Sequence, residues 1–222
     1  MSAFILHQIA DQAAGRFILP QYKAEKYFVG LKHRTLTFDD GYLGALSFLA
    51  AHSEIMADNR VILFIASEAV GARNFWDDDG ELSGQELADW SLLRHLREAG
   101  CVIGSHGRFH NDLRALSDAD LREELTVSKK VLEDNLGCSV DSFAYPYGLY
   151  DQRVIEFVKA AGYGEAFTTC GSVLQGRGNP FRRPRLEIRG TDSDLVVRLK
   201  LCGFYDAASM GELPRLLWER WR

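Results

Sequence analysis

Two short segments of the sequence hold side chains of the kinds that bind metal ions and move protons. The first is Asp39-Asp40-Gly41, which follows an apolar run, and the second holds His106 and His110, four residues apart. Two adjacent carboxylates are costly to bury together, because each charge raises the pKa of its neighbour. A divalent cation removes that cost by taking one carboxylate as a ligand, and the other is then free to act as a base. Two histidines four apart can face the same way on a helical turn, as many paired imidazole ligands do.

Each segment also has a plain structural interpretation. Asp39 and Asp40 are typical of a turn in which Gly41 supplies a positive φ, and His106 and His110 are compatible with ordinary surface or core positions. The other histidines lack such an arrangement, and we interpret them as structural or surface residues. These are His7, His33, His52 and His95.

A third segment, Phe143–Gly148, has the sequence Phe-Ala-Tyr-Pro-Tyr-Gly. Tyr145 precedes Pro146 and is therefore expected to be extended, and the following turn could aim the amide of Tyr147 into a site. The segment is also consistent with an aromatic loop packed on the rim of a barrel. In their order and spacing, the three segments together resemble the polysaccharide deacetylase family, also called the NodB-homology domain or carbohydrate esterase family 4.

The resemblance covers roughly Leu36 to Thr169. Thr37–Gly41 matches the first motif of the family residue for residue, and Ser105–His110 matches the second motif in its paired histidines. Phe143–Gly148 matches the third motif only in part. The fold that the resemblance implies is an α/β distorted (β/α) barrel with about seven strands.

The resemblance also implies roles for the site residues. Asp40, His106 and His110 would ligate one divalent metal ion, with zinc as the expected ion, and Asp39 would be the general base. The backbone N–H of Tyr147 would help to bind the developing oxyanion. The implied reaction is the metal-dependent hydrolysis of an N-acetyl group from an amino sugar, in a poly- or oligosaccharide or a glycan precursor, without an organic cofactor.

The sequence departs from the family at the third motif. Where the family has an arginine that orients the base, this chain has Ala144. Arg185, just after the fifth predicted strand, is a plausible substitute and completes the predicted catalytic set. It could equally belong to a solvated basic loop together with Arg182 and Arg183.

The fourth family motif has no match near Thr168–Gly171, and the fifth motif has no match at all. The fifth motif is a leucine–histidine pair that supplies the general acid, and no histidine follows His110. Asp39 could take the proton from water and pass it to the leaving amine. Two other functions remain open: hydrolysis of another linear amide C–N bond, and glycan binding by a domain that has lost its acid.

The elements that must position these residues are short apolar runs alternating with amphipathic helical patterns, as in α/β proteins with a parallel sheet. We expect helix caps at Ser83 and Ser117, each followed three residues later by an acidic residue. The predicted strands are Thr35–Phe38, Val61–Ala66, Val102–Ser105, Ser142–Tyr145 and Ala166–Thr169. The predicted helices are Gly84–Ala99, Leu121–Leu136 and Arg153–Ala161.

Length and composition bound the remaining questions. A chain of 222 residues is expected to form one domain, residues 1–222, with a core at about 34–190. The formal net charge of -5 argues against a nucleic-acid partner. The sequence has no apolar run long enough for a transmembrane segment and no signal-like start, so we expect a cytoplasmic protein. Four aromatic residues near predicted strand ends could stack on sugar rings or serve only in packing. These are Phe75, Trp76, Tyr147 and Tyr150.

Overall fold

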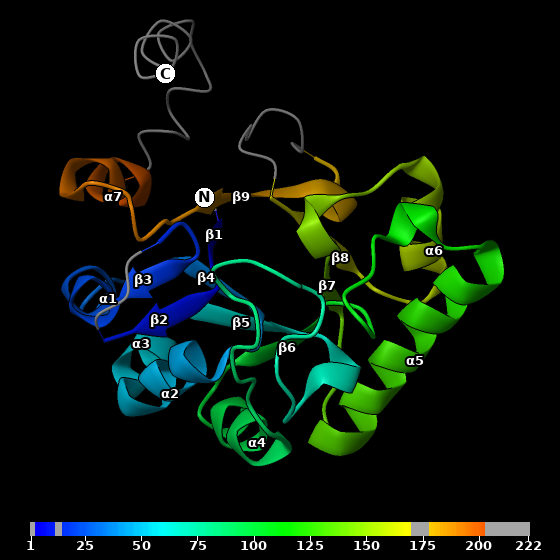
Figure 1. Ribbon diagram of the computed structural model, residues 1–222, viewed down its shortest axis with the longest axis horizontal. Helices are drawn as coiled ribbons and strands as arrows, with labels where there is room; N and C mark the ends of the chain where they lie inside the picture. The colour runs from blue at the N-terminus through cyan, green and yellow to red at the C-terminus, as the bar shows by residue number, and fades with distance from the viewer. Residues whose placement is uncertain (1–2, 12–14, 170–177, 203–222) are drawn as a thin grey trace, which may run out of the picture.

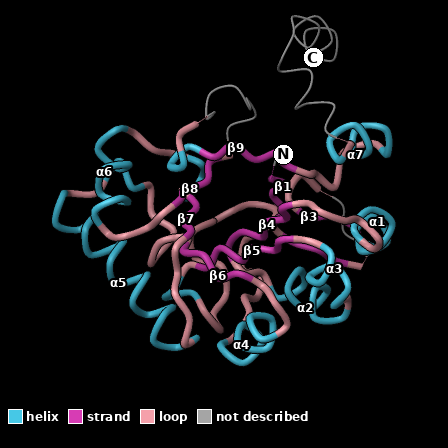
Figure 2. The backbone as a smooth tube through the Cα atoms, turned by 180° about the vertical axis from the view of Figure 1, so that it is seen from behind, coloured by secondary structure: helices cyan, strands magenta, loops and turns pink. Residues whose placement is uncertain are grey.

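Seven parallel strands close into a barrel, which is seen as a ring in Figure 2. The computed structural model describes residues 3–11, 15–169 and 178–202. The barrel strands are β1 (Ala3–Leu6), β4 (Thr35–Asp40), β5 (Arg60–Ile65), β6 (Val102–Ser105), β7 (Ser142–Ala144), β8 (Glu165–Thr168) and β9 (Arg183–Glu187). They follow one another around the ring in chain order, and β9 pairs with β1 to close it. The predicted (β/α) barrel of about seven strands is confirmed.

The helices lie on the outside of this ring (Figures 1 and 2). They are α1 (Gln21–Phe28), α2 (Leu43–Ala51), α3 (Ser53–Asp58), α4 (Trp90–Glu98), α5 (Asp118–Leu136), α6 (Gln152–Ala160) and α7 (Asp194–Leu201). A small parallel sheet of β2 (Gln8–Ala10) and β3 (Ile18–Pro20) follows β1. Within the described ranges, no helix is both long and apolar enough to cross a bilayer.

The apolar residues form two layers. The larger layer fills the space between the strands and the outer helices, and a smaller one fills the inside of the barrel. Inside the barrel, a Cβ atom at Gly104 would lie 2.5 Å from the ring of Phe64, so this tight contact requires glycine. The barrel is therefore filled by side chains. The inner layer consists of Ala3, Ile62, Phe64, Ala144 and Phe167.

The five predicted strands are all present, with ends that differ by one or two residues. The strand predicted at Thr35–Phe38 continues to Asp40, so both acidic residues belong to the strand rather than to a turn. The sequence did not predict β1 or β9, the two strands that close the barrel.

The predicted start of the helix at Gly84–Ala99 is wrong. This helix, α4, begins at Trp90, where the side chain of Asp89 accepts a hydrogen bond at 2.8 Å from a backbone N–H of the first turn. Ser83 lies in a turn and does not cap a helix, and Glu86 instead forms an isolated β-bridge. Leu87, the first apolar residue of the predicted helical pattern, instead belongs to a separate small cluster with Leu82.

The second predicted cap is confirmed. Ser117 accepts a hydrogen bond from the N–H of Asp120 at the start of α5. Gly137 ends the helix with φ 61°, a left-handed conformation that glycine adopts at low cost.

Candidate active site

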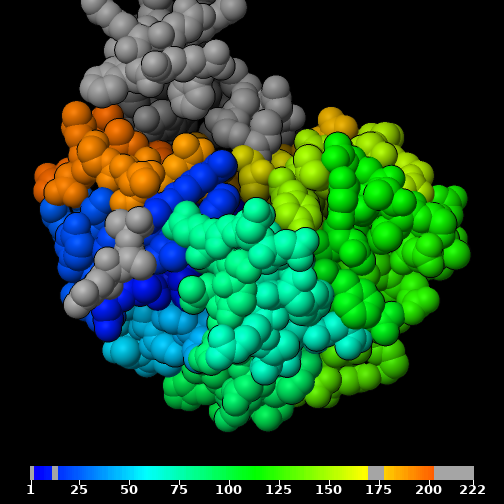
Figure 3. Space-filling model, in the orientation of Figure 1, coloured from blue at the N-terminus to red at the C-terminus, as the bar shows by residue number. Residues whose placement is uncertain are grey.

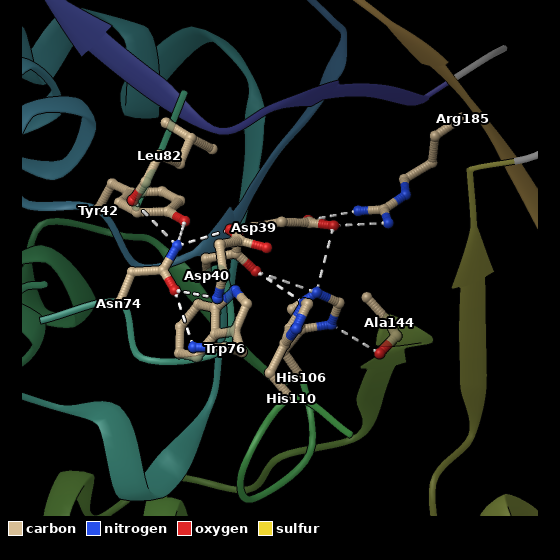
Figure 4. A network of polar contacts seen from close by, with 11 residues as sticks. Asp39, Asp40, Tyr42, Asn74, Trp76, Leu82, His106, His110, Ala144 and Arg185 are labelled. Atoms are coloured by element: carbon tan, nitrogen blue, oxygen red, sulfur yellow. Dashed lines mark hydrogen bonds and ion pairs between the residues drawn. The ribbon is translucent and has the colours of Figure 1, made fainter. Parts of the chain in front are cut away.

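The three polar segments of the sequence meet at one end of the barrel (Figure 4). Asp39 and Asp40 are the last two residues of β4, His106 directly follows β6, and Tyr147 lies in a 3₁₀ turn after β7. The carboxyl ends of parallel strands share one edge of the sheet, so segments far apart in the chain converge there. A cleft of about 940 Å³ opens at this edge, and these residues line it together with His110.

Asp40, His106 and His110 form a buried cluster that could hold a metal ion. Their ligand atoms lie within 4.8 Å of one another, and Asp40 Oδ1 is 3.3 Å from Nε2 of each histidine. Among the described residues, Asp40 Oδ1 and His110 Nδ1 are buried without a hydrogen-bond partner. An unsatisfied buried carboxylate oxygen is costly, and a cation between these three side chains would remove the cost. One carboxylate and two imidazoles therefore fit a divalent ion.

Neighbouring groups fix the rings of both histidines. His106 Nδ1 lies 2.8 Å from the carbonyl oxygen of Ala144. Since a carbonyl only accepts, Nδ1 donates, and this contact turns Nε2 toward Asp40. The ring of His110 stacks on Trp76 at 4.7 Å and meets the edge of Tyr147 at 4.4 Å. The ligand atoms are thus held in place by contacts outside the cluster.

The charge states within the cluster suit metal binding. Burial opposes the ionisation of Asp40, but His110 and His106 outweigh it and hold the pKa of Asp40 well below its usual range. Burial lowers the pKa of His110. At His106 burial also acts to lower the pKa, but Asp40 and Asp39 outweigh it and raise it. Asp40 is accordingly a carboxylate and His110 a neutral imidazole at neutral pH, the forms in which both bind metals.

Asp39 forms a separate pair with Arg185 on the other side of the cluster. The guanidinium donates to both carboxylate oxygens, at 2.6 Å and 2.8 Å, and also to Thr37 Oγ1 at 2.9 Å. Arg185 is 1% exposed and Asp39 2% exposed, so the pair is screened from water. Such a bidentate contact fixes the orientation of a carboxylate as well as its charge. Asp39 Oδ2 lies 3.8 Å from His106 Nε2, at the edge of the candidate metal position.

The backbone is strained where the site residues lie. Four described residues other than glycine have a positive φ, and three of them are Asp40 at 68°, His110 at 61° and Tyr147 at 58°. This conformation is unfavourable for a residue with a Cβ atom and persists only where the surroundings enforce it. The concentration of strain at this edge is typical of a functional site.

One expectation about local structure is wrong, and one alternative interpretation is excluded. His106 and His110 do not share a helical turn, because the chain between them is an irregular loop in which His110 is left-handed. Arg185 does not lie in a solvated basic loop, because it is the central residue of β9 and points into the barrel toward Asp39.

His7 was interpreted as structural or surface, yet it lines the same cleft as Asp39. It directly follows β1, whose last residue, Leu6, pairs with Phe38 of β4. Continuing this register by one residue places His7 beside Asp39. The ring of His7 meets that of Phe17 edge-on at 5.0 Å. His7 stands in a leucine–histidine pair, but at the opposite end of the chain from where the family motif predicts one.

Two of the four aromatic residues considered for sugar stacking line the cleft, namely Trp76 and Tyr147. Phe75 is 50% exposed and meets Trp76 edge-on at 5.2 Å. Tyr150 stacks on Tyr145 at 4.8 Å and serves in packing.

Asn74 is a positioning residue that no sequence pattern singles out. It lies in the loop between β5 and α4, which crosses the face of the molecule seen in Figure 3, in cyan to teal. Its amide donates to the hydroxyl of Tyr42 at 2.7 Å and to the carbonyl of Leu82 at 3.0 Å, and it accepts from the N–H of Trp76 at 3.1 Å. Asn74 thereby fixes the loop that holds Trp76 against His110 (Figure 4).

Comparison with known proteins assigns the class. A family model described as polysaccharide deacetylase matches residues 29–166, more than half of the chain, and the chain belongs to this family. Among curated proteins it is similar to the poly-beta-1,6-N-acetyl-D-glucosamine N-deacetylase of Staphylococcus aureus, with 27% identity over 131 residues. The match covers 56% of this chain and 44% of that protein, so it spans less than half of the relative.

Solved structures share the fold. A Streptococcus pyogenes deacetylase in complex with acetate superposes with a TM-score of 0.67 at 15% identity, covering 90% of this chain and 97% of that one. A polysaccharide deacetylase from Bacillus cereus gives a TM-score of 0.68 at 18% identity, covering 95% and 68%. At these identities the likeness concerns the barrel alone.

Proposed function

We propose that this protein is a metal-dependent N-deacetylase that hydrolyses the acetamide of N-acetylated amino sugars in a glycan. The observation that carries the proposal is the convergence of Asp40, His106 and His110 next to an Asp39 carboxylate that Arg185 holds from behind. Family membership supports the reaction, and the staphylococcal relative supports β-1,6-linked N-acetylglucosamine as the first substrate to test.

Asp40, His106 and His110 would hold the ion, and their donor set favours zinc. Three protein ligands of the imidazole and carboxylate types are common at catalytic zinc sites, which keep a further position open. Such an ion polarises a carbonyl group and makes a water molecule more acidic, which activates both partners of an amide hydrolysis.

Asp39 acts as the general base in this proposal. It lies against the metal cluster, 3.8 Å from His106 Nε2, and Arg185 binds both of its oxygens, so its carboxylate remains in one orientation. A positioned base contributes about 10²–10⁴-fold to such a reaction. Arg185 acts through Asp39 and takes the place of the arginine that the third motif lacks.

Tyr147 contributes its backbone N–H to the oxyanion that develops on the acetyl carbonyl. Its left-handed conformation, at φ 58° and ψ 5°, reverses the chain at the cleft wall. An oxyanion donor of this kind is worth roughly 10²–10³-fold in rate. The phenol ring packs against His110, and burial raises the pKa of its hydroxyl, so the side chain stays neutral.

The leaving amine needs a proton when the C–N bond breaks, because an amide anion is a very poor leaving group. His7 is a candidate donor because it lines the cleft beside Asp39 and belongs to neither the metal cluster nor the Arg185 pair. In a simpler scheme, Asp39 takes the proton from water and passes it to the nitrogen. In the first scheme, replacing His7 removes the proton donor. In the second scheme, the donor Asp39 is still present when His7 is replaced.

The test is acetate release from a panel of acetylated β-1,6-glucosamine oligomers, chitin oligomers and amino-sugar precursors, combined with metal analysis of the purified protein. We expect about one equivalent of zinc and hydrolysis of at least one acetamide. Asp39→Asn should abolish hydrolysis and retain the metal.

Three results would speak against the proposal. An active Asp39→Asn variant would remove the general base. A metal-loaded protein that cleaves another amide but no acetamide would favour the alternative function, hydrolysis of another linear amide C–N bond. Bound metal with no hydrolysis at all would favour a glycan-binding domain.

A further inference from the structure

The loop that carries both metal-binding histidines has an unusual backbone. Between β6 and the next 3₁₀ turn, Gly107 has φ 84° and His110 has φ 61°. Two left-handed residues three positions apart are not a regular turn, so the loop needs partners that hold this shape.

One side of the loop is held through its carbonyl groups. The N–H of Ser67 donates to the carbonyl of Gly107 at 3.1 Å, and the N–H of Glu68 donates to the carbonyl of Arg108 at 3.0 Å. Both donors belong to the segment after β5. They fix the start of the loop but leave the amides on its other side to be satisfied.

Those amides point to a single buried carboxylate. Glu124 Oε1 accepts from the N–H of Arg108 at 2.8 Å and from the N–H of Phe109 at 2.9 Å, while Oε2 faces Asn111 Nδ2 at 3.4 Å. Glu124 lies on α5 and is 4% exposed. Its partners are N–H groups rather than cations, whereas the guanidinium of Arg108 pairs with Glu68 and Glu123 instead.

Glu124 and the loop depend on each other. A buried carboxylate is unfavourable unless hydrogen bonds satisfy it, and Glu124 finds these bonds only with the loop in its present shape. A Cβ atom at position 107 would lie 2.9 Å from Glu124 Oε1, so the close approach also requires Gly107.

We propose that Glu124 is a positioning residue for the metal site: its carboxylate fixes the 106–110 loop in the shape that presents both histidines to the ion. The proposal rests on the proposed metal role of Asp40, His106 and His110. Groups that orient metal ligands from behind typically change metal affinity by about 10- to 100-fold when they are removed.

The competing explanation is electrostatic, since a buried negative charge near the site would also favour a cation. Two variants separate these explanations. Glu124→Gln keeps the length of the side chain and an oxygen that can accept from both N–H groups, but it removes the charge. Glu124→Asp keeps the charge but withdraws the carboxylate from the loop by one methylene group.

The experiment measures Zn²⁺ affinity by competition with a chromophoric chelator, and amide hydrogen exchange of the loop in the metal-free protein. We expect Glu124→Asp and Glu124→Ala to bind Zn²⁺ about 10- to 100-fold more weakly, and Glu124→Gln to stay within roughly threefold of the wild type. Loop amides should exchange faster in the Asp and Ala variants only. Glu123→Gln is the matched control, because it removes a charge from the neighbouring exposed residue without touching the loop amides.

If Glu124→Asp bound Zn²⁺ as tightly as the wild type and Glu124→Gln bound it weakly, the proposal would be overturned in favour of the charge effect. Wild-type affinity in both Asp and Ala variants would overturn it as well, as would an equal loss in Glu123→Gln. If Ala does not fold, the comparison of Asp with Gln decides. If the wild type bound neither Zn²⁺ nor Co²⁺, the metal role would fail by itself. Loop exchange would then decide whether Glu124 fixes the loop: faster exchange in Glu124→Asp supports it, and unchanged exchange refutes it.

Discussion

At the scale of single residues, the proposed mechanism assigns proton transfer to two side chains of the cleft, His7 and Asp39. Asp39 lies near the end of β4, and His7 directly follows the neighbouring strand β1. Both residues line the cleft. Asp39 is bound on both oxygens by Arg185, which holds the carboxylate in one orientation and so disfavours its movement as a proton carrier between two positions. His7 is a separate imidazole, a side chain that can serve as a general acid.

If His7 donates the proton, the effect of replacing His7 on the rate should depend on the leaving group of the substrate. We expect His7→Gln to slow acetamide hydrolysis by roughly 10²–10⁴-fold. It should slow hydrolysis of 4-nitrophenyl acetate only slightly, because nitrophenolate departs without a proton. The measurement compares kcat/KM for both substrates.

The matched control is His95→Gln, on the exposed face of α4. Equal losses on amide and ester would contradict proton donation by His7, and full amide activity would return the role to Asp39.

At the scale of elements, the sequence predicts the strands better than it predicts the helix ends. The strands are continuous apolar runs buried on both faces, so β4, β5, β6, β7 and β8 were found within one or two residues. β9 was missed because it has the sequence Arg-Pro-Arg-Leu-Glu, which resembles a basic loop. Its central arginine is tolerated inside the barrel only because Asp39, distant in the chain, neutralises it. No local pattern carries that information.

The same limit applies to the site. The candidate metal cluster could be predicted because three segments together resemble a known family, although each segment alone was equally compatible with a structural role. Asn74 and Glu124 could not, since each acts through backbone groups of a loop whose shape the sequence does not reveal.

The start of α4 gives a direct test of the corrected boundary. We expect Asp89→Ala to lower the free energy of unfolding by about 0.5–2 kcal/mol, because it removes the cap of this helix. Ser83→Ala should change it by less than about 0.5 kcal/mol, because Ser83 lies in an exposed turn. Urea unfolding of both variants measures the difference, and the reverse order would restore the helix start first predicted at Gly84.

Glu165, at the start of β8, connects strands around the barrel. Its carboxylate accepts from Ser142 at 2.6 Å and from Arg60 at 2.5 Å, and lies 3.0 Å from Arg183. Burial opposes its ionisation, but Ser142 and Arg60 outweigh it and hold its pKa below the ordinary value of 4.5. A carboxyl group with a lowered pKa stabilises the fold above the pKa of the unfolded chain. That contribution is lost as the pH falls through the lower folded value.

Glu165→Gln should therefore be less stable than the wild type by about 1–2 kcal/mol at pH 7, a figure reduced because both arginines are partly exposed. The difference should shrink below about pH 4, where the wild-type carboxyl also becomes protonated. Urea unfolding from pH 7 to pH 3 tests this, with the exposed Glu156→Gln as control. A gap that is constant with pH would contradict an ionic origin.

At the scale of the whole molecule, the metal cluster joins β4 to the loop after β6, so an ion bound there stabilises the folded state only. At 100 times its Kd, zinc should add about 2.7 kcal/mol. For a chain of this size, that raises Tm by about 5–10 °C. Calorimetry with zinc and with EDTA measures the shift. His110→Ala should show a much smaller one, and an equal shift in that variant would locate the ion elsewhere.

Pairing of β1 with β9 joins residues 3–5 to residues 185–187. During synthesis on a ribosome, β1 is made first among the barrel strands and β9 last. One edge of β1 therefore stays unpaired until β9 has been made. The same pairing places Arg185 beside Asp39, so the proposed base gains its partner only when β9 joins the ring. A nascent chain that stops short of β9 would carry His106, His110, Asp39 and Asp40 and still lack the guanidinium that orients Asp39.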